Sequence, residues 1–328
     1  MGGAATQAIE VVRRGRARLD GRTLNIACFA GFLIMVGALV AINGPILSRD
    51  SIFLLALAGL LAISASDVSS WARGVIVDWL PFYLALLAYD LLRGFVGNNP
   101  LYPALVTPQI RVDEWLFAGS VPTVDLQERF FEPGTIHWYD MAAWAVYLTH
   151  FFTIFVIAAV LWRVARPRFL AFRAMVITLS FAAFFTYLFL PAAPPWMASD
   201  SGEIGAVSRV IGDVWGTLGI EPAQAIWQHG SSFANEVAAL PSLHTAFPVL
   251  ILCFFWPTGG WRARTICLLY ALAMSLVLVY TGEHYVADVL LGWIYAIATY
   301  VGVSRVRARL ARRRDQRAAS APAVAEGA

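Results

Sequence analysis

Three ionisable residues lie at the starts of two long apolar segments, at a spacing that suits group-transfer chemistry. His244 follows Pro241-Ser242-Leu243, and His284 precedes Asp288 by four positions. Residues four apart share one face of a helix, so the Asp288 carboxylate can hold the His284 imidazole in one tautomer and favour its charged form. Two histidines beside an oriented carboxylate favour nucleophilic and acid–base chemistry.

The composition places these residues in a membrane protein. The 328-residue chain is 59% hydrophobic and only 14% charged, whereas soluble domains are about 25% charged. All 24 basic residues are arginines, so lysine takes no part in the chemistry. Cys28, Cys253 and Cys267 lie in apolar stretches without the spacing of a disulfide or metal site. We therefore expect no metal and no cofactor.

Apolar stretches long enough to span a bilayer recur along the chain. A spanning helix needs about 20 mostly apolar residues. Eight segments are candidates, the second being the shortest: 24–42, 51–66, 75–93, 141–163, 170–190, 240–257, 263–281 and 286–304. The expected fold is therefore an all-α polytopic membrane protein with about eight transmembrane helices.

The distribution of arginine predicts the orientation of these helices. With both termini in the cytoplasm, 19 arginines fall on the inner side and five on the outer side, as the positive-inside rule requires. The outer five are Arg49, Arg93, Arg111, Arg129 and Arg209. We expect a basic cytoplasmic tail (1–23), one transmembrane catalytic domain (24–304) and a basic, disordered cytoplasmic tail (305–328).

Two long segments, about 94–140 and 191–239, fall on the outer side. Both are too polar to span a membrane but rich in aromatic residues, which favours helices lying in the head-group layer. The aromatic residues concerned are Trp115, Phe117, Phe130, Phe131, Trp138 and Tyr139 in the first segment, and Trp196, Trp215 and Trp227 in the second.

On this topology both histidines lie at the outer ends of helices. Ser242 is a suitable N-cap residue for a helix carrying His244 in its first turn, and His284 and Asp288 open the last span. Each helix start presents free amides and the positive end of its dipole, which together favour a phosphate ligand. The alternative is that each histidine only caps a helix or forms a hydrogen bond within the bundle.

These motifs resemble a known group of enzymes. Pro-Ser-Leu-His at 241–244, followed about 40 residues later by His-Tyr-Val-Ala-Asp at 284–288, resembles the type 2 phosphatidic acid phosphatase superfamily. The flanking residues, with Pro-Ala-Ala-Pro-Pro-Trp at 191–196, resemble its inositol phosphorylceramide synthase branch. Weaker similarity comes from 89–93, 113–117 and 147–151, and the resemblance covers about 80–303. It implies a six-helix catalytic core, about 75–304, with extra N-terminal helices.

The resemblance assigns roles to the three residues. His284 would be the nucleophile that accepts the phosphoryl group, and Asp288 would orient it. His244 would protonate the leaving oxygen and then activate an acceptor hydroxyl or water. This chain departs from the phosphatase branch because it lacks the lysine of that branch and has Leu278 where the branch has an arginine before the nucleophile.

The groups that neutralise the phosphate must therefore come from elsewhere in the chain. The expected substrate- and phosphate-binding residues are Arg93, Arg209, His150, Ser242, Asp90 and Trp196, with Arg111, Arg129 and His229 as further outer-side candidates. Alternatives stay open for several of them: Arg93 can pair with Asp90 three residues earlier, His150 can form a packing hydrogen bond, and Trp196 can end and anchor a helix.

The sequence therefore predicts a membrane phosphotransferase with its site on the outer face. The resemblance implies a phosphohistidine-type intermediate and a phosphoinositol group moving from phosphatidylinositol to a lipid or glycan acceptor. A lipid or prenyl phosphate phosphatase, with water as acceptor, is the alternative. A lipid transporter would place charges at mid-membrane depth, which the last three spans lack. A structural scaffold would leave the two histidines and Asp288 unexplained. The expected partners are lipids and the membrane, with no nucleic acid, and the oligomeric state is left open.

Overall fold

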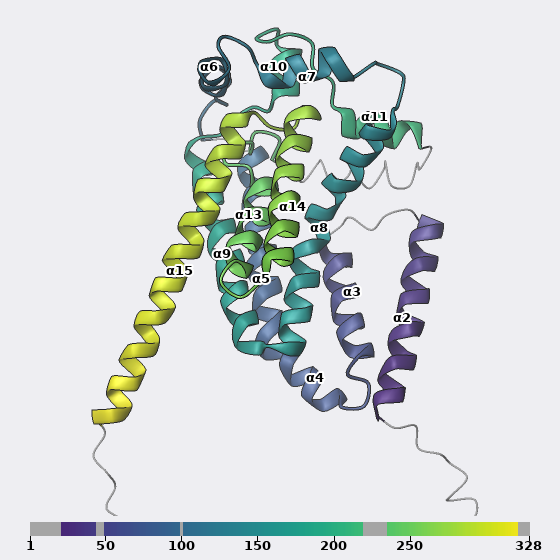
Figure 1. Cartoon of the computed structure of the whole chain (residues 1–328), viewed down its shortest axis with the longest axis vertical. Coiled ribbons are helices and arrows are strands. Elements are labelled where there is room, and N and C mark those ends of the chain that lie inside the picture. The colour runs from purple at the N-terminus through teal and green to yellow at the C-terminus, as the bar shows by residue number, and fades with distance from the viewer. Residues whose placement is uncertain (1–20, 44–48, 99–100, 219–234, 321–328) are drawn as a thin grey trace, which may run out of the picture.

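A computed structural model describes residues 21–43, 49–98, 101–218 and 235–320, and these residues fold into helices with no named strand. Figure 1 shows the long helices packed side by side into a bundle, with short helices gathered at one end. The predicted all-α, polytopic class is confirmed.

Within the described residues, six helical stretches are long and apolar enough to cross a membrane. They contain α2 (Gly21–Asn43), the run from α4 (Val68–Gly74) through η1 (Val75–Trp79) to α5 (Leu80–Asn98), α8 (Trp138–Val164), α9 (Arg166–Phe189), α14 (Trp261–Tyr280) and α15 (Val286–Ser320). The other two expected spans, 51–66 and 240–257, form the shorter apolar helices α3 (Arg49–Ala62) and α13 (Leu243–Phe255).

The short helix α13 lies inside the bundle. It packs against α15, α14 and α9, and most of its side chains are buried. A helix surrounded by protein does not need the length of the bilayer, because its ends can meet protein loops instead of lipid head groups. The burial of α13 fixes the position of the residues at its start.

In the part of the chain that the structure describes, four short helices cover the end of the bundle from which α15 starts: α6 (Thr107–Leu116), α7 (Pro122–Phe130), α10 (Pro195–Asp200) and α11 (Val210–Thr217) (Figure 1). Trp115 and Trp138 are strongly exposed there, as suits the head-group layer. Trp215 is fully buried against Trp144, so its expected interfacial position is wrong. Trp227 lies outside the described residues.

Backbone hydrogen bonds join three extended segments beneath these helices. Leu105 and Ala192 form one parallel bridge, and Ala192 and Ala238 form another. The Ala192 amide donates to the Val237 carbonyl at 2.6 Å, and the Leu105 amide donates to the Pro191 carbonyl at 2.7 Å. The Pro-Ala-Ala-Pro-Pro-Trp motif therefore anchors the strand-like segment that leads into Pro241-Ser242.

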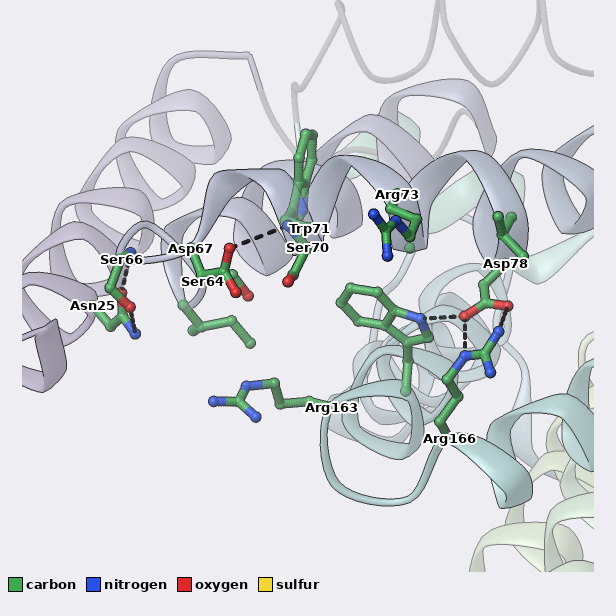
Figure 2. Close-up of a pocket in the computed structure, with 14 residues that line it drawn as sticks. Asn25, Ser64, Ser66, Asp67, Ser70, Trp71, Arg73, Asp78, Arg163 and Arg166 are labelled. Atoms are coloured by element: carbon green, nitrogen blue, oxygen red, sulfur yellow. Dashed lines mark hydrogen bonds and ion pairs between the residues drawn. The ribbon is translucent and has the colours of Figure 1, made fainter.

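The opposite end of the bundle carries most of the described arginines. Asp78 is buried there and accepts two hydrogen bonds from Arg166, at 2.6 and 2.7 Å, and one from Trp162 at 2.9 Å (Figure 2). This ion pair fastens η1 to the turn between α8 and α9. The position agrees with a structural role for Asp78 far from the histidine motifs.

The C-terminal segment differs from the expected disordered tail. Helix α15 continues without a break to Ser320, well past the expected boundary at 304. The segment from Arg305 onward is rich in arginine and alanine, which favour helix formation. Residues 321–328 lie outside the described part of the chain.

Candidate active site

The loop that carries His284 begins at the C-terminus of α14. The Glu283 amide donates to the Leu278 carbonyl at 3.1 Å and the Gly282 amide to the Val279 carbonyl at 3.4 Å, which is the Schellman pattern. Gly282 has φ +79°, and a Cβ there would lie 2.8 Å from the Ser208 carbonyl oxygen. Both facts require glycine immediately before Glu283 and His284.

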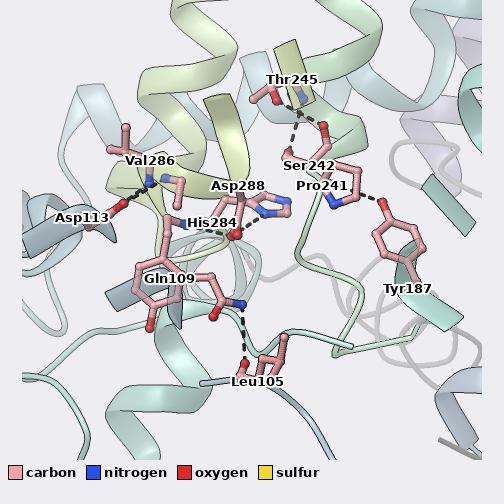
Figure 3. Close-up of polar contacts among 12 residues, drawn as sticks. Leu105, Gln109, Asp113, Tyr187, Pro241, Ser242, Thr245, His284, Val286 and Asp288 are labelled. Atoms are coloured by element: carbon pink, nitrogen blue, oxygen red, sulfur yellow. Dashed lines mark hydrogen bonds and ion pairs between the residues drawn. The ribbon is translucent and has the colours of Figure 1, made fainter. Parts of the chain in front are cut away.

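His284 and Asp288 form the first half of the site. Asp288 is fully buried, and its Oδ2 accepts from the Tyr285 amide at 3.0 Å and lies 3.3 Å from His284 Nδ1 (Figure 3). The expected contact between His284 and Asp288 is present, but the two residues do not share a helix. Because α15 begins at Val286, His284 precedes the helix and Asp288 reaches back to it from the first turn. The bonded Nδ1 leaves His284 Nε2 as the free ring nitrogen.

The second half of the site is the start of α13. Ser242 is the N-cap, and its hydroxyl accepts from the Thr245 amide at 3.4 Å. The Ser242 amide donates to the Asp288 carbonyl at 3.1 Å, so the two motifs are joined through the backbone. A Cβ at Gly292 would lie 2.5 Å from the Ser242 carbonyl oxygen, so α13 and α15 meet without an intervening side chain. As a result, the His244 and His284 ring centroids are 5.7 Å apart.

Two residues of α8 pack against the His244 ring. The Tyr147 ring stacks on it with centroids 5.2 Å apart and an interplanar angle of 20°. The His150 ring, one helical turn further along, has its centroid 3.9 Å from that of His244. The structure therefore brings the predicted His150 to the site, in direct contact with the expected acid–base residue.

Arg209 is held close to His284 by Glu283, the residue that precedes His284. Its Nε and Nη2 donate to the two Glu283 oxygens at 2.8 and 3.2 Å. Its guanidinium carbon lies 5.1 Å from the centre of the Trp196 ring. Burial lowers the pKa of Arg209, but the Glu283 carboxylate more than offsets this and raises the pKa above the ordinary arginine value. The guanidinium therefore stays charged.

Arg93 approaches the site from α5. Its Nη2 lies 3.9 Å from Asp90 Oδ1, a long ion pair, and its guanidinium carbon lies 5.8 Å from the Tyr89 ring centre. Both Arg93 and Arg209 lie within electrostatic range of the His244 imidazole. By contrast, the side chains of Arg111 and Arg129 are exposed on the short helices. His229 and the side chain of Arg49 lie outside the described part of the structure.

This arrangement agrees with the comparisons with known proteins. A model of the PAP2 superfamily matches residues 121–302, a segment that contains both histidine motifs. The chain belongs to the PAP2 superfamily. It is also 26% identical over 279 residues to the phosphoinositol dihydroceramide synthase of Bacteroides thetaiotaomicron, covering 81% of this chain and 86% of that protein. No solved structure gives a significant match.

The chain is therefore a membrane enzyme of the PAP2 superfamily, with lipid phosphotransferase or phosphatase activity. Among its described residues, no group of three or more histidine, cysteine, aspartate or glutamate side chains has the arrangement of a metal site.

Asp113 is a site residue whose position sequence reasoning missed. From α6 its two oxygens accept from the Val286 and Ala287 amides at 3.0 and 2.8 Å, so it caps the helix that starts beside His284 (Figure 3). Burial raises the pKa of Asp113 to about 6, against the two amide bonds, which lower it. The Asp-Glu-Trp run at 113–115 was the available signal, but only the fold could connect it to α15.

Gln127 on α7 is a second missed residue. Its Nε2 donates to the Tyr280 and Ser208 carbonyls at 2.8 and 2.9 Å, and its Oε1 accepts from the Ser208 amide at 2.7 Å. These bonds tie the end of α14 to the loop that carries Arg209. Glutamine in a short polar helix gave no signal in the sequence, because its partners are all backbone groups distant in the chain.

Proposed function

We propose that this PAP2 enzyme transfers a phosphoinositol group from phosphatidylinositol to a hydroxyl of a lipid or glycan acceptor, through a covalent intermediate on His284. The observation that carries the proposal is the joint geometry of three side chains. His284 has one nitrogen held at 3.3 Å from a buried carboxylate, and its ring lies 5.7 Å from that of His244. A phosphorus atom between the two rings can meet a nucleophile on one side and an acid on the other.

In the first step, the lone pair on His284 Nε2 forms a bond to phosphorus. The bond from phosphorus to the diacylglycerol oxygen breaks, and the protonated His244 gives its proton to that oxygen. Diacylglycerol leaves, and the phosphoinositol group stays on His284. Asp288 stabilises the positive charge that the His284 ring acquires and holds its Nδ1–H in place.

In the second step, His244 takes a proton from the acceptor hydroxyl. The acceptor oxygen forms a bond to phosphorus while the bond to His284 Nε2 breaks, which restores the free enzyme. Water in place of the acceptor gives hydrolysis through the same residues. A lipid or prenyl phosphate phosphatase is therefore the second candidate function, favoured by the family itself, which includes phosphatases.

Negative charge on the transferring group needs cationic partners, since the chain has no lysine. Arg209 and Arg93 support this role because both guanidinium groups lie within electrostatic range of His244. Guanidinium groups can bind two phosphate oxygens at once and stay charged at any working pH. Neither arginine is a free cation: Glu283 and Asp90 hold them in position before substrate binds.

Two observations support the donor and the location of the site. The similarity to a phosphoinositol dihydroceramide synthase extends over most of both chains, which favours an inositol-containing phospholipid. Of the arginines assigned to the inner side, those that the structure describes lie on elements at the end of the bundle opposite His284, which favours an active site on the outer face.

The test is product analysis with purified full-length protein. Phosphatidylinositol labelled in the inositol ring is supplied with a ceramide, diacylglycerol or glycan acceptor, and the products are identified by mass spectrometry. Transfer predicts diacylglycerol together with a new inositol phosphate ester of one acceptor. Release of free inositol phosphate alone supports the phosphatase instead, and no reaction with phosphatidylinositol overturns the choice of donor.

A further inference from the structure

A cavity lies at the end of the bundle opposite the histidine motifs. It has a volume of about 530 Å³ and is bordered by the N-terminal part of α2, the segment joining α3 to α4, and the α8–α9 turn. Its polar lining includes Asn25, Ser64, Ser70, Arg73 and Arg163 (Figure 2). Because none of the catalytic side chains borders it, the proposed reaction gives this cavity no role.

The net charge of the residues that line the cavity matches that of one monovalent anion. Three arginines and two aspartates border it, which leaves one net positive charge. Arg166 is committed to the buried Asp78 through a bidentate ion pair. By contrast, Arg73 and Arg163 have no hydrogen bond or ion pair to any described residue. Asp67 caps α4 through the Ser70 amide at 3.2 Å and forms no ion pair with either arginine.

A further hydrogen-bond donor lies beside these arginines. Trp71 lines the cavity, and its indole Nε1 is buried without a hydrogen-bond partner among the described residues. The Asn25 side chain bonds to Ser66 at 3.1 and 2.9 Å, which fastens α2 to the segment before α4 and closes one side of the cavity. Hydrogen bonds therefore hold one wall of this positively charged cavity in place.

The cavity lies next to exposed apolar side chains as well as to arginines. Arg163 is the last residue but one of the apolar helix α8. Val77 lines the cavity and is exposed, and its neighbours Ile76 and Val164 are exposed as well. Exposed apolar side chains next to arginines match a molecule with an acidic head and hydrocarbon chains.

We propose that this cavity binds the phosphate of an anionic phospholipid, with Arg73 and Arg163 on the phosphate oxygens and the acyl chains along Val77 and its exposed neighbours. A single phosphodiester charge neutralises the net positive charge of the lining. The bound lipid bridges α4 and α8, and so stabilises the packing of the N-terminal helices on the catalytic bundle. The site is independent of the reaction proposed above.

The first experiment measures the thermal unfolding of full-length protein in neutral detergent with increasing phosphatidylglycerol. Phosphatidylcholine and inorganic phosphate are the comparison ligands. The double variant Arg73→Gln/Arg163→Gln is expected to raise the apparent Kd for phosphatidylglycerol at least about tenfold, since two charges near the lipid are lost. The matched control Arg312→Gln/Arg313→Gln removes the same charge from the exposed end of α15 and should keep the wild-type Kd.

Equal weakening in both double variants would overturn the site, because the lipid would then respond only to overall charge. Stabilisation by inorganic phosphate equal to that by the lipid would overturn the lipid assignment. A second measurement needs no variant: photoactivatable phosphatidylglycerol is crosslinked to the wild-type protein. Crosslinks are expected within residues 63–77 and 162–166, and crosslinks confined to other segments would overturn the proposal.

Discussion

The ion pair between Arg209 and Glu283 gives a prediction that separates a catalytic contribution from a structural one. Arg209→Ala removes a guanidinium from the proposed phosphate site and also leaves the Glu283 carboxylate without its partner. The side chain of Glu283 is only 10% exposed and that of Arg209 31% exposed. Removing one member of a buried pair costs about 3–5 kcal/mol, and the partial exposure of Arg209 puts this case at the low end, about 3 kcal/mol.

The rate effect has a different size and a different cause. Loss of one donor to the transition state lowers kcat about 10²- to 10³-fold. Glu283→Gln leaves the Arg209 guanidinium and its charge in place. The rate should therefore fall by no more than about tenfold, because the guanidinium loses only the ion pair that positions it. The double variant Arg209→Ala/Glu283→Gln should regain most of the stability, because no unpaired carboxylate remains, but none of the rate.

The assays are thermal unfolding in detergent and the initial rate of diacylglycerol release from phosphatidylinositol. Stability and rate should respond differently to the second substitution, which a double-mutant cycle measures directly. If the double variant recovers both stability and rate, Arg209 acts only by neutralising Glu283, and its assignment to the phosphate is wrong. Arg209→Lys should keep part of the rate, because lysine carries the charge without the two-pronged geometry.

Three further predictions follow from other contacts. Arg93→Ala should lower kcat/KM for phosphatidylinositol about a hundredfold, and a wild-type value in steady-state kinetics would remove Arg93 from the site. The pKa of Asp113 is raised to about 6, above about 3.9 in the unfolded chain, so the unfolding free energy of the wild type should fall as pH rises from about 4 to about 6. The Tm of the wild type should therefore fall with pH relative to that of Asp113→Asn, and parallel plots of Tm against pH for the two proteins would refute this. Gly292→Ala should lower both Tm and activity, because its Cβ would lie 2.5 Å from the Ser242 carbonyl oxygen, whereas Gly302→Ala, with nothing within 4 Å, should leave both unchanged.

The fold class could be predicted from the sequence because the length of an apolar segment is a local property of the chain. Each expected span coincides with a helix, since about 20 apolar residues have few alternatives in a membrane. The length of α13 was not predictable in this way. Whether an apolar segment meets lipid or protein depends on its neighbours, and α13 is covered by α9, α14 and α15. The continuation of α15 to Ser320 follows from the helix propensity of its arginine and alanine residues, so the expectation of a disordered tail from residue 305 was wrong.

The site was predictable where two short motifs carried it. The spacing of His284 and Asp288 indicated their contact, although His284 lies just before the helix and not in its first turn. His150 was predicted as a site residue, with a packing hydrogen bond as the alternative. Its contact with the His244 ring could not be predicted, because it depends on how α8 packs on α13. Asp113 and Gln127 were missed because they bind backbone amides and carbonyls far along the chain, which leave no pattern in side-chain spacing.

Mass spectrometry of the enzyme itself can identify the residue that acts as the nucleophile. Full-length protein is mixed with phosphatidylinositol in the absence of acceptor, quenched in alkali, and digested. The peptide containing His284 is expected to gain the mass of a phosphoinositol group. Asp288→Asn should lower the rate of this labelling, and His284→Ala should show neither label nor turnover. A label on His244 or His150 instead, or turnover by His284→Ala above about a tenth of the wild-type rate, far more than loss of a nucleophile allows, would contradict the assignment of His284 as the nucleophile.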